Sequence, residues 1–221
     1  MEALKQRRYI AVMDIIQTGD WGKLIIRRVD HDFITSNYDE IMSDMHRQRK
    51  ERIERFNNTN ARDTSIVAGK LLQEIVEKEM GIRAGDIEIV QNENGKPSIK
   101  SQNDFFYSIS HSGDYVGIAY SNRQIGLDIE KIRPCREKVA KRCFTPDECS
   151  YITSVPERED EFFCRIWTMK ESYLKLLGLG ISVPLNSFNA NPYNMTVSDE
   201  KFRYYEIKLD GYIVMLCVEN T

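Results

Sequence analysis

The sequence predicts an α+β fold in which strands pair as antiparallel hairpins and long helices cover them. Three short runs of strand-forming residues follow one another between residues 105 and 130, with only turn residues between them. Two longer stretches, 64–80 and 157–177, carry apolar residues at helical spacing instead. Because helices and strands are grouped and do not alternate one by one, the pattern favours α+β over a parallel α/β sheet.

The elements expected before residue 100 follow from apolar periodicity and from turn residues. An uninterrupted apolar run predicts a buried strand, and apolar residues three and four apart predict helices. Gly81 is placed to end the second helix, because glycine readily adopts the left-handed conformation of a helix C-cap. In order, the expected elements are a strand at 9–13, an exposed helix at 39–56, a helix at 64–80, a strand at 87–90 and a turn at 94–97.

After residue 100 the chain predicts a meander, two helices and a C-terminal hairpin. Gly113-Asp114 and Asn122-Arg123 separate the strands of the meander as hairpin turns would. Thr145, Pro146 and Glu148 form a helix start with an N-cap, an early proline and a capping glutamate. The expected elements are strands at 105–110, 115–120 and 125–130, a helix beginning at 145, a helix at 157–177, and a hairpin of 204–209 with 212–218.

Composition argues against several classes of protein. The chain has 221 residues, 41% of them hydrophobic, and its 31 basic and 34 acidic residues give a formal net charge of −3. A protein that coats nucleic acid usually carries a basic excess. Five cysteines without C-x-x-C spacing argue against a disulfide framework or a zinc site. No apolar run approaches the roughly 20 residues of a membrane span, so we expect a cytoplasmic protein without nucleic-acid or membrane partners.

Asp128 and Glu130 are the first candidates for metal ligands. Residues two apart on a strand point to the same face, so both carboxylates of the strand at 125–130 would lie together. Paired carboxylates repel each other unless a cation lies between them, and Mg²⁺ prefers oxygen ligands of this kind. Taken alone, an aspartate and a glutamate two residues apart are common, and a solvated edge strand with an acidic face is the simpler interpretation.

Glu171 lies on the helix at 157–177, with Trp167 and Lys175 one turn to either side on the same face. The opposite stripe of this helix is apolar enough to pack on a sheet. The alternative for Glu171 and Lys175 is a surface ion pair worth only about 0.3–0.5 kcal/mol. A third carboxylate opposite Asp128 and Glu130 would instead complete a metal site.

Two motifs make the chain resemble the Sfp-type 4′-phosphopantetheinyl transferase superfamily. The motifs are Gly126-Leu127-Asp128-Ile129-Glu130 and Trp167-Thr168-Met169-Lys170-Glu171-Ser172-Tyr173-Leu174-Lys175. Further family landmarks occur in the right order between residues 95 and 188. They are Gly95-Lys96-Pro97, Ser110-His111-Ser112-Gly113, Phe144 with Glu148, Gly178-Leu179-Gly180 and Pro184-Leu185.

The resemblance implies two similar α+β subdomains with pseudo-two-fold symmetry, residues 1–121 and 122–221, with the ligand in the cleft between them. It implies transfer of 4′-phosphopantetheine from coenzyme A to a serine of an apo carrier protein, with release of 3′,5′-ADP. Mg²⁺, or alternatively Mn²⁺, would be held by Asp128, Glu130 and Glu171. The carrier could be an acyl, peptidyl or aryl carrier domain with an acidic docking helix, and the enzyme is expected to act as a monomer.

The resemblance also assigns roles to single residues. Glu171 is the first choice for the base that deprotonates the acceptor serine, and Glu148 is the second. Lys175 would place a cation at the diphosphate, assisted by Lys170. His111 would contact the 3′-phosphate of coenzyme A, and Ser110 beside it is also expected to bind coenzyme A.

Other expected contacts of coenzyme A lie in the first half of the chain. Lys96 and Pro97 would approach the adenine or a phosphate. The family has an arginine four residues before the glycine that corresponds to Gly69, whereas this chain has Ser65 there. The missing charge could come from Arg49, Arg52 or Arg62. A second departure is Ser108, where the family usually has asparagine, which can form one more hydrogen bond.

Two other functions use the same residues. A metal-dependent phosphohydrolase or nuclease would employ the three carboxylates to cleave phosphoesters without coenzyme A, but it gives no reason for the segment at 110–113. A non-catalytic carrier-binding module would keep the fold but has no use for three mutually repelling carboxylates. Chance matches on an ordinary α+β domain would require all the landmarks to coincide.

Overall fold

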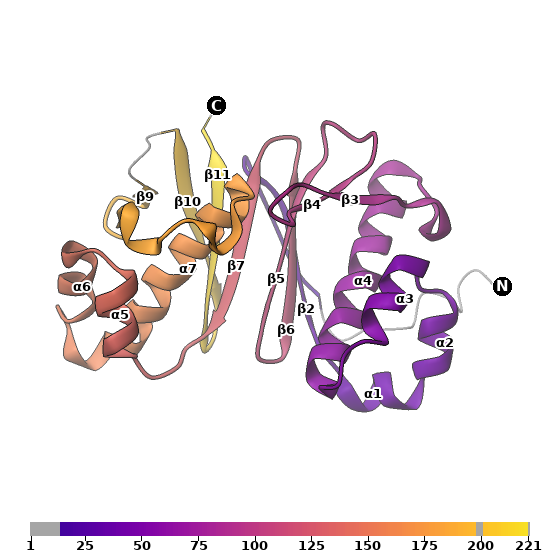
Figure 1. Ribbon diagram of the computed structural model, residues 1–221, viewed down its shortest axis with the longest axis horizontal. Coiled ribbons are helices and arrows are strands. Elements are labelled where there is room, and N and C mark those ends of the chain that lie inside the picture. The colour runs from indigo at the N-terminus through magenta and orange to yellow at the C-terminus, as the bar shows by residue number, and fades with distance from the viewer. Residues whose placement is uncertain (1–13, 198–200, 221) are drawn as a thin grey trace.

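The computed structural model describes residues 14–197 and 201–220, and it confirms the α+β class (Figure 1). Two antiparallel sheets lie side by side in the middle of the molecule, with helices on both outer flanks (Figure 1). The strand expected at 9–13 lies outside the described residues.

The first sheet is built from the N-terminal part of the chain and has the order β1-β2-β6-β5. Neighbouring strands in it are all antiparallel. The 22-residue helix α4 (Thr59–Met80) packs Leu71, Ile75 and Val76 into one core with residues of β5 and β6. The strands are β1 (Ile15–Gly19), β2 (Gly22–Arg28), β5 (Phe106–Ser112) and β6 (Tyr115–Ser121).

The second sheet comes from the C-terminal part and has the order β7-β11-β10-β9-β8. The 19-residue helix α7 (Glu159–Leu177) packs Phe163, Ile166 and Met169 into a core with residues of β10 and β11. The strands are β7 (Ile125–Lys131), β8 (Ala190–Asn191), β9 (Thr196–Val197), β10 (Phe202–Leu209) and β11 (Tyr212–Glu219).

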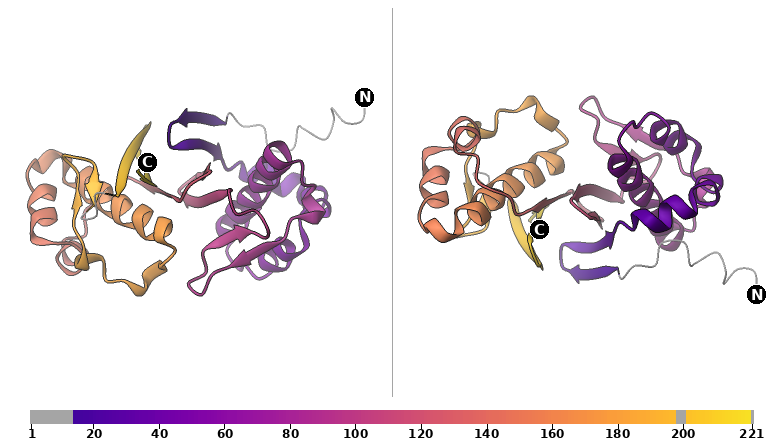
Figure 2. Two further views of the ribbon diagram at one scale, coloured as in Figure 1. Left: turned by 90° about the horizontal axis from the view of Figure 1, so that it is seen from above. Right: turned by 90° about the horizontal axis from the view of Figure 1, so that it is seen from below.

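Short elements complete the two flanks. Seen from above and below, the hairpin of β3 and β4 reaches from the N-terminal flank toward the C-terminal one (Figure 2). The helices are α1 (His31–Ser36), α2 (Tyr38–Ser43), α3 (Arg47–Ile53), α5 (Glu137–Cys143) and α6 (Pro146–Ile152). The other elements are η2 (Ala84–Asp86), β3 (Ile89–Gln91), β4 (Pro97–Ile99), η3 (Pro156–Arg158), η4 (Gly180–Ser182) and η5 (Leu185–Ser187).

Several expected elements are confirmed with small shifts. Helix α4 begins five residues before the predicted start because the Asn58 side chain caps it, and it ends at Gly81 with φ +69° as predicted. Helix α6 has both hydrogen bonds of the capping box between Thr145 and Glu148. The C-terminal hairpin of β10 and β11 is confirmed.

The single helix expected at 39–56 is wrong, because α2 ends at Ser43 and α3 begins at Arg47. The carbonyl of Asp44 accepts hydrogen bonds from Lys70 Nζ and Gln73 Nε2 of α4, at 3.3 and 3.5 Å. It is thereby drawn into a tertiary contact. The spacing of apolar residues within 39–56 cannot show this interaction. It holds the segment between α2 and α3 against α4.

The prediction of a hairpin turn at 122–123, between β6 and β7, is also wrong. Strand β6 pairs with β2 on one edge and with β5 on the other, which leaves no edge for β7. Strand β7 pairs with β11 instead, so the chain changes sheet between residues 121 and 125. This change coincides with the boundary predicted near 121, although independent folding of the two parts stays a prediction. Among the described residues, no helix is both long and apolar enough to cross a membrane.

Candidate active site

The candidate site lies where helix α7 crosses strand β7. A Cβ atom added to Gly126 would lie 1.9 Å from the Ser172 carbonyl oxygen and 2.5 Å from the Leu176 backbone nitrogen. Only glycine therefore permits the backbone of α7 to approach β7 this closely. The next residue on the same face of β7 is Asp128, and Lys175 reaches it from α7. The glycine of the first motif thus explains how close the helix lies to the strand.

Asp128 is the centre of the site and is only 5% exposed. Its Oδ1 accepts a hydrogen bond from Lys175 Nζ at 2.6 Å and one from the Ser110 hydroxyl at 2.9 Å. Its Oδ2 is buried and has no hydrogen-bond partner among the residues that the structure describes. A carboxylate oxygen buried without a partner costs free energy, so this atom is suited to ligate a cation.

Glu130 and Glu171 lie close enough to Asp128 for their charges to act on one another. Burial, followed by the charge of Asp128, raises the pKa of both glutamates. Ser112 donates to Glu130 at 3.2 Å, and Arg133 lies 3.4 Å from its other oxygen. Asp128 and Glu130 both raise the pKa of Glu171, so Glu171 lies near the two strand carboxylates and not alone in solvent.

The three carboxylates do not stand in the geometry of a completed metal site. Within residues 14–197 and 201–220, no group of three His, Cys, Asp or Glu side chains is arranged to hold an ion directly. The ammonium of Lys175 lies against Asp128 Oδ1. The chemistry of the donor set nevertheless fits Mg²⁺ or Mn²⁺, because it offers hard oxygen ligands and one of them is a buried oxygen without a partner.

Basic residues form a second part of the site, beside the carboxylates. His111 reaches solvent from the end of β5, and its pKa is lowered by the protein packed around it, then by Lys175, with a smaller effect of Arg52. Arg49 contributes a half-buried side chain whose pKa is lowered by burial and then by Arg52. These influences place His111, Lys175 and Arg52 within electrostatic range of one another.

Arg49 lies in the place where the family's helical arginine is missing. Its side chain crosses Gly69, where an added Cβ would lie 2.9 Å from Arg49 Cγ, and its Nη1 donates to the Ser65 hydroxyl at 3.4 Å. No carboxylate in the described part of the chain pairs with it. A half-buried cation without an acidic partner is suited to bind an anion from solution.

Arg62 and Lys96 have other partners. Arg62 pairs with the fully buried Asp63 at 3.0 Å and lies over the Tyr38 ring, 5.0 Å from its centroid. Lys96 donates to the Leu176 carbonyl at the end of α7, and burial lowers its pKa to about 8. Pro97 begins β4 and pairs with Gln91. The structure thus gives Arg62 and Lys96 structural contacts.

Glu148 and Lys170 form a buried ion pair. The Nζ–Oε1 distance is 2.7 Å, and the side chains are 1% and 0% exposed. Glu148 also accepts hydrogen bonds from the backbone nitrogens of Thr145 and Ala190, and Lys170 donates to two carbonyls of the loop after α7. In this arrangement neither side chain is accessible to coenzyme A or to a substrate serine. The pair anchors α6 and that loop to α7.

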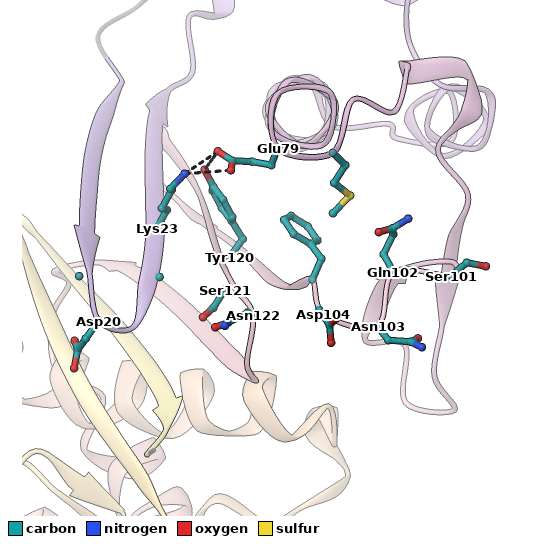
Figure 3. A pocket seen from close by; sticks show the side chains of 14 residues that line it. Asp20, Lys23, Glu79, Ser101, Gln102, Asn103, Asp104, Tyr120, Ser121 and Asn122 are labelled. Atoms are coloured by element: carbon teal, nitrogen blue, oxygen red, sulfur yellow. Dashed lines mark hydrogen bonds and ion pairs between the residues drawn. The ribbon is translucent and has the colours of Figure 1, made fainter.

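A cavity of about 740 Å³ lies elsewhere (Figure 3). It opens between the β1–β2 turn, the end of α4 and the loop at 101–105. A cluster of Lys23, Glu79 and Tyr120 crosses one wall, with Lys23 Nζ 2.9 Å from Glu79 (Figure 3). None of the expected site residues lines it. We therefore place the site at the carboxylates and not in this cavity.

Sequence reasoning missed the part that serines play at the site. Ser110 was expected beside coenzyme A, but its hydroxyl binds Asp128 and Lys175. Ser112 was not assigned a role, yet it donates to Glu130. The alternation of Ser108, Ser110 and Ser112 on a strand is a signal for a polar stripe, but it does not show which neighbour the stripe meets.

Comparisons with known proteins agree on one family. Residues 124–216 match the family described as 4′-phosphopantetheinyl transferase superfamily, and residues 19–123 match the 4′-phosphopantetheinyl transferase N-terminal family. A 4′-phosphopantetheinyl transferase of Bacillus subtilis is 32% identical over 162 residues, 73% of this chain and 72% of the relative. The transferase Sfp of Bacillus subtilis strain 168 is 32% identical over 152 residues, 68% of each chain.

More distant relatives include a eukaryotic one. The L-aminoadipate-semialdehyde dehydrogenase-phosphopantetheinyl transferase of Mus musculus is 31% identical over 183 residues, 74% of this chain and 58% of the relative. The crystal structure of Thermotoga maritima holo-[acyl-carrier-protein] synthase gives a TM-score of 0.38 at 20% identity, over 44% of this chain and 63% of that one. The sequence matches carry the assignment: the chain is an enzyme that belongs to the 4′-phosphopantetheinyl transferase superfamily.

Proposed function

We propose that this transferase uses Mg²⁺ at Asp128, Glu130 and Glu171 to move 4′-phosphopantetheine from coenzyme A to a serine of an apo carrier protein. The observation that carries the proposal is the buried Oδ2 of Asp128, which has no partner and lies in a cluster of three carboxylates. The family membership supplies the donor and the class of acceptor. Mn²⁺ would suit the same oxygen ligands.

In this reaction the acceptor serine oxygen forms a bond to the β-phosphorus of coenzyme A, and the bond to the bridging diphosphate oxygen breaks. The leaving group is 3′,5′-ADP, and the serine proton passes to a base. When bound, the metal ion would neutralise the charge that develops on the diphosphate. Lys175, whose ammonium already lies beside Asp128, would contribute a second positive charge at the same oxygens.

Glu171 is the proposed proton acceptor. It comes from helix α7 and not from the strand that carries Asp128 and Glu130, and burial and the neighbouring Asp128 raise its pKa above the ordinary value in the metal-free protein. It has no hydrogen-bond partner in the described part of the chain that would compete for the proton. Glu148, the second candidate from sequence, is held in its buried pair with Lys170.

The other end of the donor would lie on the basic cluster. Arg49, Arg52 and His111 are grouped beside Lys175, and the 3′-phosphate of coenzyme A carries the charge that they could bind. The donor would thus extend from the N-terminal part of the molecule to the carboxylates on β7 and α7. Lys96, Pro97 and Arg62 are not needed for this placement.

A basic segment next to the site is suited to an acidic carrier protein. Six basic residues and one acidic residue lie between 131 and 142, directly after Glu130. Arg136 and Lys138 are exposed within it. We propose that the monomer docks the carrier here, so that charge reversal in Lys138→Glu raises KM for the carrier and leaves KM for coenzyme A unchanged.

The decisive experiment incubates the protein with coenzyme A, Mg²⁺ and an apo carrier, and then measures the mass of the carrier. We expect the carrier to gain one phosphopantetheine group, and the gain to be lost in Asp128→Ala and Glu171→Ala. The control Asp86→Ala removes an exposed carboxylate from the other flank and should change nothing. If the masses of fatty-acid, polyketide and peptide-synthetase carriers all stay unchanged, the proposal is refuted. Release of 3′,5′-ADP without a carrier would favour a phosphohydrolase.

The five cysteines are free thiols, which agrees with a reducing compartment, so we place the reaction in the cytoplasm. The carrier's pathway is decided by which apo carrier is modified fastest. This comparison needs only the same mass measurement with equal concentrations of acyl, peptidyl and aryl carrier domains.

A further inference from the structure

Strands β5 and β7 lie side by side at the junction of the two sheets (Figures 1 and 2). No backbone ladder joins them in the described part of the chain, since β5 is an edge of the first sheet and β7 an edge of the second. The junction is made instead by side chains of β5 and backbone nitrogens of β7.

Three serine hydroxyls supply the hydrogen bonds of this junction, beside an apolar core to which both sheets contribute. Leu127 N donates to Ser108 Oγ at 2.9 Å, and Ile129 N donates to Ser110 Oγ at 3.1 Å. A third bond, from the Lys131 nitrogen to Ser112 Oγ, measures 3.0 Å. Each bond joins residues 19 positions apart, so the two strands run parallel in a fixed register.

The hydroxyl of Ser110 has two further partners. It donates to Asp128 Oδ1 at 2.9 Å and accepts from Lys175 Nζ at 2.9 Å. A hydroxyl has one hydrogen to donate and two lone pairs to accept with. With Ile129 N as the second donor, this group is fully used, and Ser110 is only 4% exposed. Its orientation is therefore fixed from three sides.

Ser108 provides an internal comparison. It is also buried, at 5% exposure, and accepts one backbone hydrogen bond from β7, but it touches neither a carboxylate nor a lysine. Each of the two serines therefore accepts one backbone hydrogen bond across the junction. Of the three serines on β5, Ser110 is the one whose described hydrogen bonds link the junction to Asp128 and Lys175.

We infer that Ser110 is a positioning residue, which holds Asp128 and Lys175 in register with each other and leaves the second oxygen of Asp128 free to ligate the metal. This inference rests on the proposed metal site. Its physical basis is that groups hydrogen-bonded to a metal ligand orient that ligand, and their loss typically weakens metal binding by about 10-fold to 100-fold. Ser110 would act through Asp128 and need not touch the ion.

The test measures Mg²⁺ affinity by calorimetry, without carrier protein, in wild type, Ser110→Ala and Ser108→Ala. We expect Ser110→Ala to raise Kd by about 10-fold to 100-fold and Ser108→Ala to leave it unchanged. An equal loss in both variants would attribute the effect to the junction and overturn the inference, as would no loss in Ser110→Ala. If wild type itself binds no Mg²⁺, the proposed metal site fails, which is a separate outcome.

A measurement on wild type covers the case in which Ser110→Ala does not fold. The Cβ resonances of Ser108 and Ser110 are followed by NMR while Mg²⁺ is added. Because the two serines lie on the same face of one strand, they are matched probes, but only the Ser110 hydroxyl binds Asp128. We expect the Ser110 resonance to move and the Ser108 resonance to stay. Equal shifts of both would contradict the positioning role.

Discussion

The contact between helix α7 and strand β7 can be tested by adding one methyl group. In Gly126→Ala the new Cβ would lie 1.9 Å from the Ser172 carbonyl oxygen, whereas ordinary contacts begin at about 3.4 Å. The difference means that the helix backbone must retreat by about 1.5 Å. The obstacles are backbone atoms, so no side-chain rotation relieves the clash.

Two measurements should respond to this retreat. Overpacking costs about 1–3 kcal/mol, which lowers Tm by roughly 2–12 °C for a chain of this size. The same shift moves Glu171 and Lys175 away from Asp128, and a misplacement of about 1 Å can reduce the rate about 100-fold. We expect kcat for carrier modification to fall by at least about that factor, even in the protein that remains folded.

Gly117→Ala is the matched control. Its Cβ would meet the ends of the Ile129 and Leu127 side chains, at 2.5 and 3.0 Å, and these can rotate away. The control should lose some stability but keep most of its activity. If Gly126→Ala retains both the wild-type Tm and the wild-type kcat, the close approach of helix and strand does not occur and the account of the site is wrong.

Three further outcomes follow from charges. Lys170→Met breaks the buried pair with Glu148 and should cost about 3–5 kcal/mol of stability; a normal Tm with lost activity would contradict its structural role. Burial and the Asp128 charge raise the pKa of Glu171, so the folded metal-free protein holds a proton that the unfolded chain releases, and its stability falls as pH rises above about 4.5. The Mg²⁺-induced rise in Tm should therefore grow with pH, and a rise independent of pH would refute this. Burial and Lys175 lower the pKa of His111, so coenzyme A, but not dephospho-coenzyme A, should cause proton uptake, measured by calorimetry in buffers of different ionisation enthalpy.

Local patterns were sufficient for the elements that dominate the two flanks. Helix α7 was predictable because its apolar stripe, its acidic first turn and the glycine that ends it all agree. The same holds for α4 and Gly81. The convergence of Asp128 and Glu130 followed from strand alternation alone. What placed Glu171 opposite them was the resemblance to the family and not the periodicity.

Tertiary partners could not be read in the same way. Lys170 and Glu171 are neighbours in sequence, and both were expected at the site. Consecutive helical residues point about 100° apart, so when Glu171 faces the strand carboxylates, Lys170 points toward α6 and finds Glu148. The sequence contains both charges of this pair but not the direction from which they meet. Similarly, the turn at 122–123 does not show that β6 has no free edge.

In the proposed placement coenzyme A contacts both parts of the molecule, and the serine junction holds these two parts against each other. The basic groups Arg49, Arg52 and His111 belong to the part that carries the first sheet, whereas Asp128 and Glu171 belong to the part that carries the second. A diphosphate and a 3′-phosphate bound at once fix the distance between these groups. Within the described residues no backbone ladder fixes the register of β5 against β7, and three hydroxyl hydrogen bonds do so beside an apolar core that β2, β6, β7 and β11 share. The junction on β5 therefore sets how well both ends of coenzyme A are held together, and weakening it should reduce affinity for coenzyme A more than affinity for the metal alone.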